Sequence, residues 1–432
     1  MFPMKKSTGR GAPWMRRAAV AALFITTPLA ALAQPMPAEV KVGTAVIIDH
    51  EFDWGRDGVY CQTCNYGAGN SRFSYIDRDH NLWVGYVDFY TGNFLPADGR
   101  AVLVDTNAVA PVEIGNGPEW TFSARGSELV YTRWTDGQAH TPMSMNVGFA
   151  RMGGGSWLAG TVEGTDARVM PVGTMDVDDA TPAVHYQNVA IGNIISNLFW
   201  RDIVPQSTVH QLPIYNNDPG MTRRWVPGTR DIIITAPAVF DSNGTVYKQV
   251  FLYNTATGVM KQLTFDAGHK LWAFMFQAPE YDNENVFFVM VNGTQLDVYR
   301  NFPRPNAPRG QGDRWRVVNT INGPPTMPYI SSPEPFVHNG HSYIFFSVTA
   351  NSDLHEFAAS AIAITGIDTS VQPMRLLTTD DNPPRARRDP EYFITANGPY
   401  IYYNRYLLAT ASSPQISEGM YRVDTGLGPR LP

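Results

Sequence analysis

Four glutamates follow a proline and stand within two residues of an aromatic side chain, and they are the first candidates for chemistry. They are Glu119, Glu280, Glu334 and Glu391. Carboxylates gathered around one pocket raise one another's pKa, so a pair can divide the acid and base roles of a cleavage reaction. Alternatively, each glutamate accepts hydrogen bonds from a neighbouring structural unit. The recurrence of the motif favours this structural role, because a catalytic residue is normally unique.

Histidine supplies the second set of candidates. His269, in the loop TFDAGHKLWAF beside Trp272, is the preferred single base, and His185 and His210 are further candidates for a base or a metal ligand. Zinc and related metals usually take several ligands at short, regular spacings, and no His-x-x-x-His pair occurs. The cofactor is therefore left open, with a divalent metal ion as one candidate.

Arginines and tryptophans supply candidates for ligand binding. The expected substrate-binding residues are Arg72, Arg223, Arg224, Arg387, Arg388, Trp225 and Trp272. The arginine fork matches a carboxylate in a bidentate way, which favours an anionic ligand such as a uronate-containing glycan. The tryptophans would stack on sugar rings. The alternatives are salt bridges to the four glutamates or solvated loop charge for the arginines, and core packing for the tryptophans.

The elements that position these residues repeat along the chain. Trp225, Tyr281, Phe336 and Tyr392 follow one another at spacings of 56, 55 and 56 residues, each before turn residues and a β-rich run. Trp120 precedes Trp225 by 105 residues, which predicts a hidden copy near 170–185, with TPAVHYQNVAIG as its candidate segment. Units of about 50 residues built from short strands are typical of a β-propeller. A pair of β-sandwiches would not explain the period.

The predicted fold is therefore all-β: a single propeller domain over residues 34–432, with seven blades, or six as the alternative, of four-stranded antiparallel sheets. After Tyr392 only three strands fit, so a strand within 38–49 is expected to complete the last blade and close the ring. In a propeller the innermost strands begin at one mouth of the channel. The four glutamates are expected at that rim, and His338 and His341 at the surface of the opposite face.

The segment QVFLYNTATGVMKQLTFDAGHKLWAFMFQAPEYDNENVFFVMV (249–291) resembles the TolB-type propeller repeat, and FSARGSELVY (122–131) is similar to that family's turn. Oligogalacturonate lyases share this style of repeat, while SPEPFVHNGHSYIFF (332–346) resembles the five-bladed glycosidases. The resemblance implies a carbohydrate-active enzyme that cleaves an anionic oligo- or polysaccharide, as a lyase or glycosidase. The alternative is a non-enzymatic TolB-like module that binds a protein or glycan at the channel mouth.

The N-terminus predicts export. Residues 1–33 combine a basic start, an apolar run and an Ala-Leu-Ala end, which is typical of a bacterial signal peptide and predicts a periplasmic or extracellular protein. The formal net charge is −6, and loss of the five leader cations brings it to −11. That charge argues against nucleic acid as a partner. No later segment is long enough to span a membrane, and a monomer is expected. Cys61 and Cys64 predict a local disulfide.

Overall fold

The computed structural model describes residues 36–53, 72–114, 117–162, 168–176, 178–188, 196–216, 223–303, 313–352, 358–379, 383–410 and 413–431. All of these residues belong to one unit, residues 36–432. The predicted leader (1–33) and the predicted disulfide between Cys61 and Cys64 lie outside the described residues. No helix in the described part of the chain is long and apolar enough to cross a membrane.

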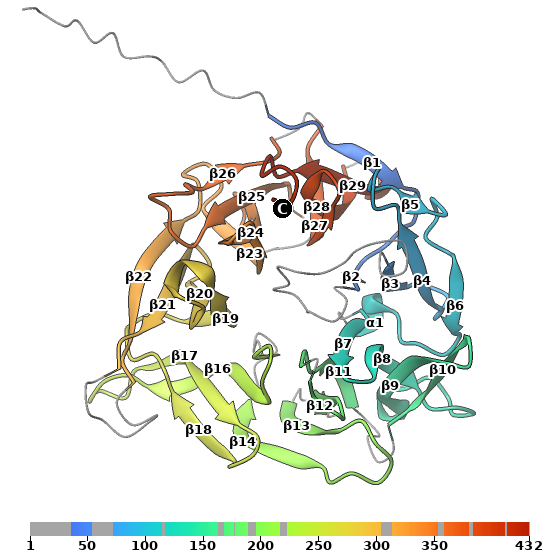
Figure 1. Ribbon diagram of the computed structural model, residues 1–432, viewed down its shortest axis with the longest axis horizontal. Helices are drawn as coiled ribbons and strands as arrows, with labels where there is room; N and C mark the ends of the chain where they lie inside the picture. Colours follow the sequence, from blue (N-terminus) through green and yellow to red (C-terminus); the bar gives the residue numbers. More distant parts are fainter. Residues whose placement is uncertain are drawn as a thin grey trace, which may run out of the picture. The chain divides into compact units, whose positions relative to one another are not determined.

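Seven antiparallel sheets form the blades of a β-propeller, which confirms the predicted fold and the larger blade number (Figure 1). From the innermost strand outward, the blades are: blade 1, β2 (His50–Phe52), β3 (Arg72–Ile76), β4 (Leu82–Val87) and β5 (Phe94–Leu95), with β6 (Val102–Asp105) also on β4; blade 2, β7 (Glu119–Ser123), β8 (Gly126–Trp134), β9 (Met145–Gly153) and β10 (Ser156–Thr161); blade 3, β11 (Arg168–Gly173), β12 (Ala183–Asn188), β13 (Ser196–Asp202) and β14 (His210–Asn216); blade 4, β15 (Arg223–Trp225), β16 (Asp231–Val239), β17 (Val246–Asn254) and β18 (Val259–Gln262); blade 5, β19 (Lys270–Ala278), β20 (Glu284–Val291), β21 (Gln295–Asn301) and β22 (Trp315–Asn322); blade 6, β23 (Tyr329–His338), β24 (His341–Thr349), β25 (Ser360–Gly366) and β26 (Arg375–Leu376); blade 7, β27 (Arg385–Thr395), β28 (Gly398–Leu407), β29 (Ile416–Asp424) and β1 (Val40–Gly43). The helical elements described are α1 (Pro111–Ile114) and two 3₁₀ turns, Pro142–Ser144 and Pro279–Tyr281.

The innermost strands surround the axis, because each contacts the innermost strand of the next blade and β27 contacts β2. We call the face on which these strands begin the entry face. In an antiparallel blade, the loops between blades and the hairpins that join the second and third strands also lie there. The hidden repeat is blade 3, although its predicted segment TPAVHYQNVAIG contributes the second strand, β12, and the innermost strand is β11.

Local sequence explains the hairpins. In the Asn339-Gly340 turn between β23 and β24, both residues have positive φ, 49° and 76°. Two-residue hairpins need this geometry, and Asn-Gly adopts it at the lowest steric cost. Buried aromatic rings then join the blades: Phe336 stacks on Tyr392 of the next blade at 4.8 Å, and Phe52 lies 5.1 Å from Phe393. Burial of each phenylalanine contributes roughly 2 kcal/mol to folding.

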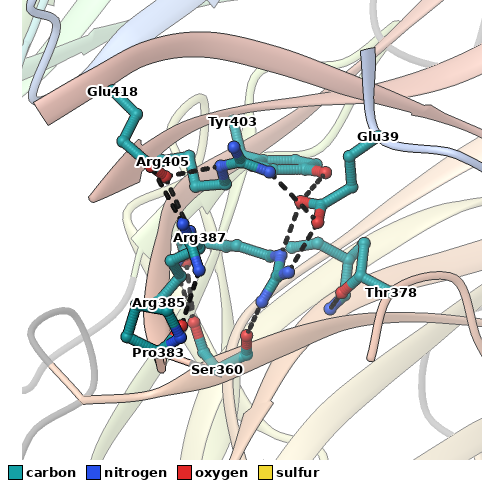
Figure 2. A network of polar contacts seen from close by, with 10 residues as sticks. Glu39, Ser360, Thr378, Pro383, Arg385, Arg387, Tyr403, Arg405 and Glu418 are labelled. Atoms are coloured by element: carbon teal, nitrogen blue, oxygen red, sulfur yellow. Dashed lines mark hydrogen bonds and ion pairs between the residues drawn. The ribbon is translucent and has the colours of Figure 1, made fainter. Parts of the chain in front are cut away.

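The ring closes where β1 pairs with β29, as predicted (Figure 1). Glu39, next to β1, binds the guanidinium of Arg387 through both oxygens, at 2.8 and 2.7 Å, and accepts the Tyr403 hydroxyl at 2.6 Å (Figure 2). Arg405 continues the network to Glu418 at 2.8 Å. These bonds lower the pKa of Glu39 against the opposing effect of its burial. The network, which we call the clasp, fastens the N-terminal strand to the last blade.

Candidate functional site

A repeated irregularity shapes the innermost strands around the axis. Four of them carry a β-bulge at a residue with φ between 46° and 55°: Met170, Trp272, Ser332 and Asp389. The ladder resumes two residues later, at Val172, Phe274, Glu334 and Glu391. A left-handed residue is uncommon outside glycine, and Asp tolerates it better than most. Because the bulge recurs, it belongs to the blade design, and only the side chains that it presents differ.

Blades 2, 4 and 6 bring three charged side chains together at the axis. Arg224 lies 3.5 Å from a carboxylate oxygen of Glu119 and 3.6 Å from one of Glu334. Glu51 of blade 1 and Glu391 of blade 7 are close enough to act electrostatically on the same guanidinium. We call these five residues the axial cluster. Of these five residues, four carry carboxylates and one, Arg224, carries a guanidinium.

Burial and mutual repulsion hold protons on the axial cluster. Burial raises the pKa of Glu334 to about 8, although Arg224 opposes the shift and Glu119 reinforces it. Burial likewise raises the pKa of Glu119. Burial raises the pKa of Glu391 well above its ordinary value, and Glu334 and Glu51 add to the effect. Desolvation disfavours the charged form of a carboxylate, so part of the cluster is protonated at neutral pH.

Glu391 is the least satisfied member of the axial cluster. Its residue is 4% exposed, and its Oε2 has no hydrogen-bond partner among the described residues. By contrast, the side chains of Arg224, Glu334 and Glu119 remain 22%, 18% and 12% exposed, so solvent in the channel reaches them. A buried carboxylate oxygen without a partner is costly to ionise, which agrees with the raised pKa of Glu391.

A pocket of about 780 Å³ lies on the entry face between blades 1 and 7. Its lining residues are Val46, Ile48, Asp49, Arg78, Pro111, Val112, Arg388, Asp389, Tyr406, Gln415, Ile416 and Ser417. This volume is within the range of about 300–1,000 Å³ that small-molecule sites occupy. Asp389 joins the pocket to the axis, because its charge acts on Glu119, Glu334 and Glu391.

His50 holds the carboxylate of Asp389 in place. The backbone N–H of His50 donates to Oδ2 of Asp389 at 2.6 Å, and its Nδ1 lies 2.8 Å from the same oxygen. The His50 side chain is fully buried, whereas that of Asp389 is 24% exposed. No donor among the described residues binds Oδ1 of Asp389, and Nε2 of His50 is likewise without a partner. The arrangement presents one oriented carboxylate oxygen to the pocket.

Two arginines bring positive charge to the lining of the pocket. The guanidinium carbon of Arg388 lies 5.4 Å from the ring centre of Tyr406. Burial raises the pKa of the Tyr406 hydroxyl, and the charges of Arg388 and Arg78 oppose that shift, which places both arginines near this ring. The lining therefore combines Arg78 and Arg388 with the carboxylates Asp49 and Asp389.

Arg223 and Trp225 of β15 flank Arg224 but serve the blade interior. Arg223 donates to Nδ1 of His185 at 3.2 Å and to the carbonyl of Met170 at 2.7 Å. Trp225 is 2% exposed, and its indole N–H donates to the carbonyl of Val172 in blade 3 at 2.9 Å. Burial lowers the pKa of His185 well below its ordinary value, so it stays neutral. These contacts support packing between blades, which is the alternative to sugar stacking that the sequence left open for Trp225.

Two predicted site residues lie on the opposite face instead. Glu280 follows the end of β19, in a 3₁₀ turn, and accepts bonds from the backbone N–H and the hydroxyl of Ser342, the latter at 2.8 Å. The expectation that it shares a rim with the other three glutamates is wrong, because the residue of β19 at the matching bulge position is Phe274. Arg72 begins β3, where Asp53 binds it and Trp120 lies 5.1 Å away.

The arginine-rich segment of blade 7, residues 385–389, lies within β27. Arg387 is 2% exposed and belongs to the clasp, where Glu39 and the carbonyl of Ser360 bind it (Figure 2). Its neighbour Arg388 lines the pocket. The alternation of a β-strand sends these two guanidinium groups to different places, so only Arg388 can meet a ligand in this pocket.

The predicted base His269 lies on the entry face, but in blade 5, just before β19. It is exposed, its Nδ1 accepts the backbone N–H of Lys248 at 3.3 Å, and Tyr247 packs edge-on at 5.3 Å. It does not line the pocket. Trp272 is half-buried at the bulge of β19. A catalytic role for His269 and sugar binding by Trp272 stay predictions.

The remaining histidines have structural surroundings. His210 stacks on Trp200 at 4.3 Å. His338 was expected at the surface, but it is 3% exposed and lies 3.0 Å from the carbonyl oxygen of Gly428, whereas His341 is exposed. No group of three His, Cys, Asp or Glu side chains within the described ranges could hold a metal ion.

The sequence contained a signal for Asp389 that the repeat obscured. In the closely matched segments SPEP and DPEY, Asp389 stands where blade 6 has Ser332, at the bulge. This difference marks the one blade whose bulge carries a carboxylate. His50 and Glu51 had no such signal, because β2 is three residues long and follows the closing strand directly.

Comparisons with known proteins confirm the architecture. No family model and no curated protein matches the chain. Similar solved structures include the β-propeller domain of Cps50 (Swd1) from Myceliophteria thermophila, with a TM-score of 0.51, 9% identity, and coverage of 90% of this chain and 99% of that one. An oligogalacturonate lyase from Vibrio parahaemolyticus gives 0.51, 10%, 91% and 94%, and TolB from Acinetobacter baumannii gives 0.36, 13%, 82% and 78%. Identities this low establish the propeller fold alone.

Proposed function

We propose that this protein is a carbohydrate-active enzyme that binds a carboxylate-bearing oligosaccharide in the pocket between blades 1 and 7 and cleaves it by β-elimination. The observation that carries the proposal is the pocket itself, which is lined by Arg388 and Arg78 together with Asp389, a carboxylate oriented by a buried histidine. Arginine suits the carboxylate of a uronic acid. The similarity of the fold to an oligogalacturonate lyase is compatible with this chemistry.

In the proposed reaction Asp389 acts as the base. Its free oxygen takes the proton on the carbon next to the uronate carboxylate, while the Arg388 charge stabilises the enolate that develops. The electron pair then forms the carbon–carbon double bond, the glycosidic carbon–oxygen bond breaks, and the leaving oxygen takes up a proton. His50 is a positioning residue, because it orients Asp389 and does not reach the pocket.

The experiment is a screen of uronate-containing and neutral oligosaccharides with the purified protein. Ultraviolet absorbance reports the conjugated unsaturated product of elimination, and a reducing-end assay reports cleavage of any kind. We expect both signals with uronate substrates, a loss of at least about 100-fold in Asp389→Asn, and no loss in Asp79→Asn, whose exposed carboxylate lies outside the pocket. Reducing ends without the unsaturated product would identify a hydrolase and refute elimination.

A second candidate is a non-enzymatic module that binds its partner at the same mouth. Its support is that three of the four candidate glutamates have partners within the protein: Glu119 and Glu334 at Arg224, and Glu280 at Ser342. This candidate predicts saturable glycan binding by calorimetry without any product, with or without added divalent metal. Both candidates retain the predicted periplasmic or extracellular location and a monomeric protein.

A further inference from the structure

The lining of the pocket carries charges of both signs, which a purely anionic ligand would not use. Arg388 and Arg78 lie near Tyr406, and Asp49 and Asp389 are the carboxylates of the lining. A carboxylate group placed next to Asp389 would meet repulsion there, whereas a cation would be attracted.

The described residues around Asp389 leave one acceptor of the pocket unused. Oδ1 of Asp389, a lining residue, has no donor in the described part of the chain. Arg224 approaches the axial cluster from blade 4 and contacts Glu119 and Glu334, not Asp389. An ammonium group has three N–H donors and no acceptor, so it matches this carboxylate oxygen.

From these observations we infer that the ligand is zwitterionic: a glycan that carries an unacetylated amino sugar next to a uronic acid, with its ammonium group on Asp389 and its carboxylate on Arg388 and Arg78. The inference rests on the proposed glycan-binding function and makes it more specific. It excludes ligands whose charged groups are all carboxylates as the best ligands of this pocket.

The test compares two tetrasaccharides that differ in one group. Both alternate glucuronic acid with glucosamine, but one has free amines and the other is N-acetylated. Calorimetry at about pH 6, below the usual pKa of an amine, keeps the ammonium form. We expect the free-amine glycan to bind about tenfold or more tightly than its acetylated partner, as a charge-assisted hydrogen bond to a carboxylate provides. Equal or tighter binding of the acetylated glycan would overturn the inference and leave the proposed function intact.

Variants locate the preference for the amine. Asp389→Asn should abolish the difference in affinity between the two glycans. Asp49→Asn, at the other carboxylate that lines the pocket, should reduce that difference and is the variant to use where Asp389→Asn does not fold. Asp79→Asn, in the hairpin beside Arg78, is the matched control and should retain it. An unchanged preference in both pocket variants would overturn the inference. If neither glycan binds, the proposed function is refuted, and the inference with it.

Discussion

The axial cluster predicts an unusual dependence of stability on pH. The raised pKa of Glu334, about 8, means that the folded protein holds a proton that the unfolded chain releases near pH 4.5. Between these values the folded state binds more protons, so the free energy of unfolding falls as pH rises. The slope reaches about 1.4 kcal/mol for each unit of pH, but it is smaller near pH 5 and pH 8, where one of the two states is only partly titrated. The loss between pH 5 and 8 therefore amounts to about 3 kcal/mol.

Glu334→Gln removes this titration while keeping the size of the side chain. In urea unfolding, we expect the free energy of unfolding of the wild type to fall between pH 5 and 8 by about 3 kcal/mol more than that of the variant. The matched control is Glu284→Gln, in which an exposed glutamate paired with Arg300 loses its charge. The control should leave the slope unchanged, since exposed pairs contribute little.

Glu391 complicates the experiment, because it can keep the shared proton when Glu334 is replaced. The double variant Glu334→Gln/Glu391→Gln removes that possibility. Isotope-edited infrared spectroscopy of labelled glutamate provides a direct measurement, since a protonated carboxyl has its own carbonyl band. The reasoning is refuted if the double variant retains the wild-type slope, or if the wild type at neutral pH has no protonated carboxyl band that the double variant lacks.

Three further variants test the contacts between blades by urea unfolding. Glu39→Gln leaves Arg387 buried without its counter-charge and should lower the free energy of unfolding by about 3–5 kcal/mol. The difference from the wild type should shrink as acid protonates Glu39 below its lowered pKa. A loss below about 1 kcal/mol would contradict the role given to the clasp. Glu280→Gln should lower stability by about 1–3 kcal/mol without changing ligand binding, and a selective loss of binding would restore its predicted role. Trp225→Phe should cost about 1 kcal/mol, and no change would argue against the indole bond.

The repeat was predictable because it is a local property. Strand periodicity, Asn-Gly turns such as Asn339-Gly340 and a recurring aromatic residue are encoded within each unit of about 50 residues. The period also predicted blade 3, whose own sequence is degenerate. Closure by a strand within 38–49 followed from counting strands after Tyr392, and β1 confirms it.

The prediction that all four glutamates share one rim failed for Glu280, because the same motif occupies different positions relative to its strand. Pro-Glu-Tyr at 279–281 resembles Pro-Glu-Tyr at 390–392, yet the first follows its strand and the second lies within β27. Sequence similarity could not separate them. The same motif lies toward the entry face when it is inside an innermost strand, and on the opposite face when it follows the end of that strand. Similarly, Arg387 and Arg388 are adjacent in sequence, but strand alternation buries one in the clasp and places the other in the pocket.

The architecture, the kind of residue on each innermost strand and the arginine and carboxylate candidates all follow from local sequence. Which of these side chains meet depends on how the blades are arranged around the axis. The axial cluster joins Glu51, Glu119, Arg224, Glu334 and Glu391 from five blades, and the pair of His50 and Asp389 spans 339 residues of chain. Such contacts arise because the ring closes on itself, and no local pattern records which side chains face one another across its axis.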